Sequence, residues 1–281
     1  MTTMMNLLKN QSSGARAGEA GFSLVELMVA SLTSVLVVGG VLVMLDGLER
    51  VHRDTQELID AQQSARLSLD KMTRDVQLAG VGLAWLLPPL PLIVPRVDGG
   101  IDIRSNQGGL TALLTADMSG PSDVLQLDDV SGFQVGMTIG LYDAGGAMDL
   151  VSVISVNSNT NQLGQTGASK AYTVVDGTAV ARIETVTYRT QTSGGKTRLM
   201  RQQGTAAAQP MAENVQGLTI TYYDDSAPPV AFNPTTLADQ LRIRTVEINL
   251  VIETENVRLN TTQRRTATLT TRVTPRAVVL S

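Results

Sequence analysis

Residues that could carry out catalysis are scarce in this sequence. Its 281 residues include no cysteine and a single histidine, His52. A cysteine nucleophile, a thiolate metal site and a disulfide are therefore excluded, and a Ser-His-Asp triad would have to be built around His52. Carboxylates lie near His52 only at helical offsets, so we expect it to be neither a metal ligand nor a general base. The composition predicts a protein that is not an enzyme and uses no cofactor.

Two pairs of adjacent acidic residues, Asp128-Asp129 and Asp224-Asp225, are candidates for calcium because hard cations bind several oxygen ligands. Neither pair belongs to a run of acids at alternate positions, as an EF-hand loop requires. We therefore interpret both pairs as acidic residues of turns and predict no metal site.

A further carboxylate, Glu26, stands at the start of an apolar stretch. A charged side chain costs about 3 kcal/mol at the centre of a bilayer, so such a residue is normally functional. The residues alone are consistent with a position near the membrane interface, since Glu26 would be only about 6 Å along a helix from Phe22.

The element that positions Glu26 is a hydrophobic helix, expected over residues 22–45. The segment from Leu27 to Leu45 contains 19 residues and no charge. As a helix it would span about 28 Å, close to the ~30 Å hydrocarbon thickness of a bilayer. The polar leader, residues 1–21, carries Lys9 and Arg16, which favour a cytoplasmic N-terminus. We predict one membrane crossing, with most of the chain outside the cytoplasm.

The apolar core follows the leader, whereas an ordinary secretory signal is discarded together with its apolar core. The junction Gly21-Phe22-Ser23-Leu24-Val25-Glu26 resembles the prepilin signal of type IV pilins and type II secretion pseudopilins, whose box reads Gly-Phe-Thr/Ser-Leu-x-Glu. This resemblance implies cleavage after Gly21 by a prepilin peptidase and N-methylation of the new N-terminus, Phe22. It also implies that Glu26 neutralises the Phe22 amine of a neighbouring subunit and so sets the register of a filament.

The helical pattern continues as an amphipathic stalk over residues 46–80. Two seven-residue series form one stripe that becomes apolar from Leu69 onward and is expected to pack on a globular domain. The series are Leu48, Thr55, Gln62, Leu69, Val76 and Val51, Leu58, Ala65, Met72, Ala79. Charged pairs four residues apart, such as Lys71 and Asp75, are assigned to the other faces. Gly80, Gly82 and Pro88-Pro89 are expected to end the helix.

The rest of the chain has the short alternating runs of an antiparallel β protein. We predict a β-rich inserted block over 81–182 and the C-terminal antiparallel sheet of the head over 183–281. Ser193 to Lys196 is a predicted hairpin turn. Leu241 and Ile243 are out of phase with Val246 in the alternating pattern, so a bulge or bend is expected near Thr245. The predicted fold class is α+β: a long transmembrane and stalk helix packed on an antiparallel β-sheet head with an additional small β-rich block, which is the lollipop of a pilin.

The C-terminal block resembles PilW-like minor pilins and J-type pseudopilins in its strands Ile183–Tyr188, Val215–Tyr223 and Arg244–Ile252. The extra β block favours the PilW-like type. The resemblance implies a minor pilin that acts in type IV pilus assembly or priming. It would be anchored in the bacterial inner membrane, with its head in the periplasm, before it enters the pilus.

The implied partners are other minor and major pilins, the prepilin peptidase, the inner-membrane assembly platform and the lipid bilayer. A J-type pseudopilin of a type II secretion system and a pilus-tip adhesin or other binding module remain alternatives. The formal net charge of −4 gives no reason to expect nucleic acid binding.

Overall fold

One long helix, α1, spans Leu24–Gln77. The computed structural model describes residues 23–83, 90–257 and 264–276, without the side chains of Asp54 and residues 255–257. The helix begins two residues after and ends three residues before the predicted bounds, 22 and 80. The chain divides into two compact units between Arg53 and Asp54, inside α1, and each unit is described by itself.

The helix ends next to two glycines, as predicted. Gly80 and Gly82 have φ values of 79° and 72°, a region that glycine enters without steric cost. The Gly80 amide donates a hydrogen bond to the Arg104 carbonyl at 2.9 Å. A Cβ atom on Gly82 would lie 2.2 Å from the carbonyl oxygen of Asn106. Both glycines thus let the chain leave the helix in close contact with residues 104–106.

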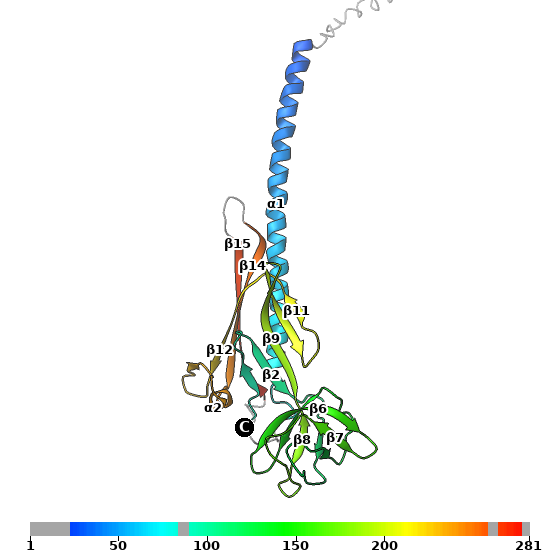
Figure 1. Cartoon of the computed structure of the whole chain (residues 1–281). Coiled ribbons are helices and arrows are strands. Elements are labelled where there is room, and N and C mark those ends of the chain that lie inside the picture. The colour runs from blue at the N-terminus through cyan, green and yellow to red at the C-terminus, as the bar shows by residue number, and fades with distance from the viewer. Residues whose placement is uncertain (1–22, 84–89, 258–263, 277–281) are drawn as a thin grey trace, which may run out of the picture. The chain divides into compact units, whose positions relative to one another are not determined.

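The strands form three antiparallel sheets within the described residues (Figure 1). The five-stranded sheet has the order β1-β2-β9-β10-β11, formed by Ile93–Pro95, Ile101–Ser105, Glu184–Ser193, Lys196–Gln203 and Gln209–Ala212. The four-stranded sheet has the order β13-β12-β14-β15, formed by Ala231–Phe232, Val215–Tyr223, Thr245–Val257 and Arg264–Val273. The six-stranded sheet has the order β3-β8-β5-β6-β7-β4, formed by Thr111–Leu113, Ala179–Arg182, Thr138–Tyr142, Met148–Asn157, Gln162–Gln165 and Leu125–Gln126. The chain is therefore α+β, as predicted.

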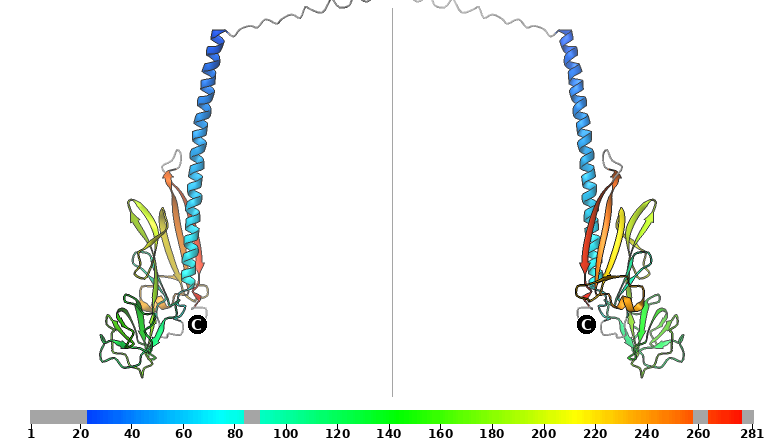
Figure 2. Two further views of the ribbon diagram at one scale, coloured as in Figure 1. Left: turned by 90° about the vertical axis from the view of Figure 1, so that its right-hand side faces the viewer. Right: turned by 90° about the vertical axis from the view of Figure 1, so that its left-hand side faces the viewer.

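The C-terminal part of α1 packs against the five- and four-stranded sheets, which lie beside it in both views of Figure 2. Five residues of the predicted stripe are buried there: Ala65, Leu69, Met72, Val76 and Ala79. Inward-facing strand residues complete this core, among them Ile103, Tyr188, Leu199, Ile248 and Leu250. The stripe prediction is confirmed for this part of the helix.

The six-stranded sheet closes on itself as a small barrel. Leu114 and Leu127, directly after β3 and β4, form an antiparallel bridge between the two end strands. The Thr115 amide donates to the Gln126 carbonyl at 2.8 Å across the same seam. The barrel has a separate hydrophobic core that includes Leu125, Leu127, Ile139, Leu141, Val153 and Leu163.

The barrel is inserted between two strands that pair directly with each other. Ser105 at the end of β2 faces Glu184 at the start of β9. The expected block 81–182 therefore divides, because β1 and β2 belong to the five-stranded sheet and only residues from Thr111 onward form the barrel. Sequence periodicity could not show this division, since it does not reveal which strands pair.

Two local predictions in the C-terminal block had different outcomes. The hairpin at Ser193–Lys196 is confirmed, because these two residues pair across the β9–β10 turn. The prediction of a bulge or bend near Thr245 is met by a turn rather than a bulge: the β14 pairing has no register shift there, and β14 begins at Thr245 after a short helix, α2, at Leu237–Leu241 and a turn at Arg242. Thr236 and Asp239 cap this helix reciprocally. Leu241 is the last residue of the helix and not part of the strand, so it does not follow the alternation of β14.

Candidate functional site

Glu26 lies in the first turn of α1, three residues after the residue that precedes the helix. The backbone amide of Ser23 donates a hydrogen bond to Glu26 Oε2 at 3.2 Å. Ser23 and Glu26 thus form one half of a capping box, in which an acidic side chain satisfies an amide at the helix start. In the sequence, the spacing of three residues between Ser23 and Glu26 is the signal that predicts this contact. Gly21 and Phe22 lie outside the described residues.

The apolar part of α1 presents hydrophobic side chains on every face. The helix is long and apolar enough to cross a membrane, and none of its most apolar 18-residue window is buried within the chain. Leu27, Leu36 and Met44 illustrate this, with 65%, 68% and 68% of their surface exposed. A helix that is hydrophobic all round needs an apolar environment from outside its own unit.

A buried carboxylate, Asp75, joins α1 to the five-stranded sheet. Tyr188 Oη on β9 donates to Asp75 Oδ2 at 2.7 Å, and Arg201 Nε on β10 donates to the same oxygen at 2.8 Å. Lys71 Nζ reaches Oδ1 at 3.1 Å. The Asp75 side chain is only 3% exposed and that of Arg201 only 17%. Burial, together with the neighbouring Asp75 carboxylate, raises the pKa of Tyr188 well above its usual range, so the phenol stays a donor.

This network was only partly predictable. The expected pairing of Lys71 with Asp75 is present, but the assignment of Asp75 to a face outside the packed stripe is wrong. Its partners Tyr188 and Arg201 are 113 and 126 residues away along the chain. Nothing local in the sequence connects them to α1. The carboxylate is tolerated in the core because charged and hydrogen-bonded partners surround it.

The acidic pairs considered for calcium lie in turns where protein donors already use their oxygens. Asp129 accepts from the Ser131 amide at 2.7 Å, and hydrogen bonds from Ser131 lower the pKa of that carboxyl. Asp224 accepts from the Ser226 amide at 3.1 Å and from Arg242 at 2.8 Å. Within the described residues, no three His, Asp or Glu side chains are grouped so as to hold a metal ion.

The remaining candidate, His52, is exposed on α1.

Comparisons with protein-family models, with curated proteins and with solved structures found no match for this chain.

Proposed function

We propose that this chain is a minor subunit of a type IV pilus, a PilW-like minor pilin that works by assembling rather than by catalysis. One observation carries the proposal: the apolar helix begins at Leu24, three residues after Gly21 in the junction that resembles a prepilin cleavage box. Cleavage after Gly21 would make Phe22 the first residue of the chain, two residues before the helix begins.

The role of each part follows from this arrangement. The apolar part of α1 would hold the subunit in the inner membrane and later pack among the helices of other major and minor pilins. Its fully exposed hydrophobic surface supports both states, because lipid and neighbouring helices are alternative apolar surroundings. The β-rich unit would be the periplasmic head that contacts partner subunits and the assembly platform.

Glu26 would supply the register of the filament. Its carboxylate is exposed and accepts a hydrogen bond from the Ser23 amide at the start of the helix. A neighbouring subunit's methylated amine would pair with it in a low dielectric, where opposite charges attract strongly. The displacement between the two helices would then equal the four residues from Phe22 to Glu26, about 6 Å.

Two substitutions separate the charge of Glu26 from its capping contact. Glu26→Gln keeps an acceptor for the Ser23 amide and removes the charge, whereas Glu26→Ala removes both. We expect both variants to be cleaved by prepilin peptidase and both to be lost from sheared pili on immunoblots. Normal incorporation of Glu26→Gln would show that capping, not charge, is the function of this residue.

The barrel favours a second candidate function, a binding module at the pilus tip. It has its own core and joins the rest of the head through neighbouring strands, as an added display module would. A head fragment that bound a surface glycan at physiological salt would support this alternative. A J-type pseudopilin would have the same helix and processing, so co-assembly with secretion pseudopilins instead of pilins distinguishes it.

A further inference from the structure

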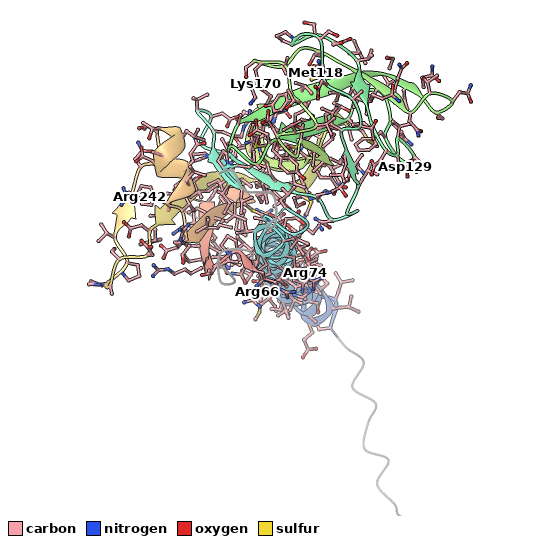
Figure 3. All side chains as sticks on the ribbon, turned by 90° about the horizontal axis from the view of Figure 1, so that it is seen from below. Arg66, Arg74, Met118, Asp129, Lys170 and Arg242 are labelled. Carbon is pink, nitrogen blue, oxygen red and sulfur yellow. The ribbon has the colours of Figure 1, made fainter. Side chains whose placement is uncertain are left out.

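One side of α1 in the second unit is left uncovered by the sheets. Six exposed residues fall on this side, spaced three or four apart as on one face of a helix: Ile59, Gln63, Arg66, Leu67, Asp70 and Arg74. We call this set the outer row. Leu67 is 69% exposed and Ile59 46%. Figure 3 shows Arg66 and Arg74 on one side of α1, opposite the barrel.

The charges of the outer row alternate along the helix: Arg66, Asp70 and Arg74 are each four residues apart. This spacing predicts ion pairs within the helix between Arg66 and Asp70 and between Asp70 and Arg74. In the described part of the chain, neither ion pair is formed. Lys71 and Asp75 on the neighbouring face do form such a pair, at 3.1 Å. The outer row therefore presents a positive, a negative and a positive charge with their hydrogen-bonding capacity still available.

The charges of the outer row are complementary to those of a second, parallel copy of the row that is shifted by four residues. If two parallel helices are displaced by four residues, Asp70 of one lies beside Arg66 of the other, and Arg74 of the first beside Asp70 of the second. The same displacement places the exposed Leu67 beside Gln63. Without a displacement, like charges would face each other, which is destabilising.

We propose that the outer row is an interface for the α1 helix of a second copy of this chain, in parallel orientation and displaced by four residues. This inference rests on the proposed function, because the displacement equals the one that pairing of Glu26 with a neighbour's Phe22 amine would set. The attraction is between exposed charges, so each pair contributes modestly and the row acts by selecting the displacement.

Disulfide trapping tests the displacement in the full-length chain, which has no cysteine of its own. Differently tagged Gln63→Cys and Leu67→Cys chains are co-expressed in membranes and oxidised. We expect the mixed dimer in several-fold higher yield than the homodimer of either variant. Equal yields for all three combinations would overturn the proposed displacement. Cross-linking only to a different pilin would overturn the assignment of a second copy.

Charge inversion provides a second test. Asp70→Arg makes the outer row uniformly positive and should reduce the mixed dimer several-fold. The triple variant Arg66→Asp, Asp70→Arg, Arg74→Asp should cross-link with itself and not with the wild-type row. Unchanged cross-linking in Asp70→Arg would overturn the role of charge. Because these residues are exposed, circular dichroism should show an unaltered fold. If the chain is cleaved normally after Gly21 but the cysteines do not cross-link, only the proposed interface is wrong. If the chain is never cleaved after Gly21, the proposed function is wrong.

Discussion

Substitution of Asp75 is expected to have the largest effect of any single charge change in the head. Asp75→Ala removes the acceptor that Tyr188, Arg201 and Lys71 share, and it leaves the mostly buried Arg201 guanidinium without its carboxylate. Loss of one partner of a buried ion pair costs about 3–5 kcal/mol. A decrease of this size would remove much of the ~5–15 kcal/mol stability of a typical domain.

The contribution of each partner can be separated. Tyr188→Phe keeps the ring in the core and removes the hydrogen bond donated to Asp75 together with the weaker one accepted from Arg201 Nε at 3.2 Å. We expect a loss of about 1.5–3 kcal/mol, because Arg201 keeps its own bond to Asp75. The double variant Asp75→Ala, Arg201→Met removes both charges and should cost less than Asp75→Ala alone, because no unpaired charge remains buried. Asp60→Ala, an exposed position on the same helix, is the matched control and should change stability by less than about 0.5 kcal/mol.

Urea unfolding of a fragment that begins at Asp54, followed by circular dichroism, measures these differences. We expect a large loss of stability for Asp75→Ala and partial recovery in the double variant. A loss below about 1 kcal/mol for Asp75→Ala, similar to that of Asp60→Ala, would refute the view that this cluster fixes the helix to the sheet.

Two further predictions concern the barrel. The hydrogen bond from Lys170 is the main cause that lowers the pKa of the Asp143 carboxyl in the folded chain. On acidification the unfolded chain therefore takes up the proton first. The stability that this carboxylate contributes is present above its ordinary pKa of about 4 and is lost as the pH falls below that value. The stability difference between wild type and Asp143→Asn, measured by urea unfolding, should therefore be constant from pH 7 to about 5 and shrink below that; a difference that vanishes near pH 6 would contradict this cause. Replacing residues 106–183 by an Asn-Gly turn between Ser105 and Glu184 should leave the helix and the other two sheets folded, because these residues already pair. Circular dichroism and proteolysis would show an unfolded product if the barrel were needed for folding.

The sequence predicted elements that depend on local pattern. The buried stripe from Ala65 to Ala79 follows from apolar residues at helical spacing, and the helix end follows from Gly80 and Gly82. The expected strand Arg244–Ile252 likewise lies almost entirely within β14. In each case the physical cause lies within a few residues, where periodicity and backbone preference act.

Contacts between distant segments could not be predicted. The barrel closes through Leu114 and Leu127, and Asp75 meets Tyr188 and Arg201, only because strands far apart in the chain become neighbours. Strand pairing, rather than residue type, decides these features.

The proposed function depends on cleavage between Gly21 and Phe22, and mass spectrometry of the mature N-terminus tests this cleavage most directly. The chain is purified from membranes of a strain with prepilin peptidase and of a strain without it. The proposed function predicts a chain that begins with methylated Phe22 in the first strain and an uncleaved chain in the second. An intact Met1 in both strains would contradict it.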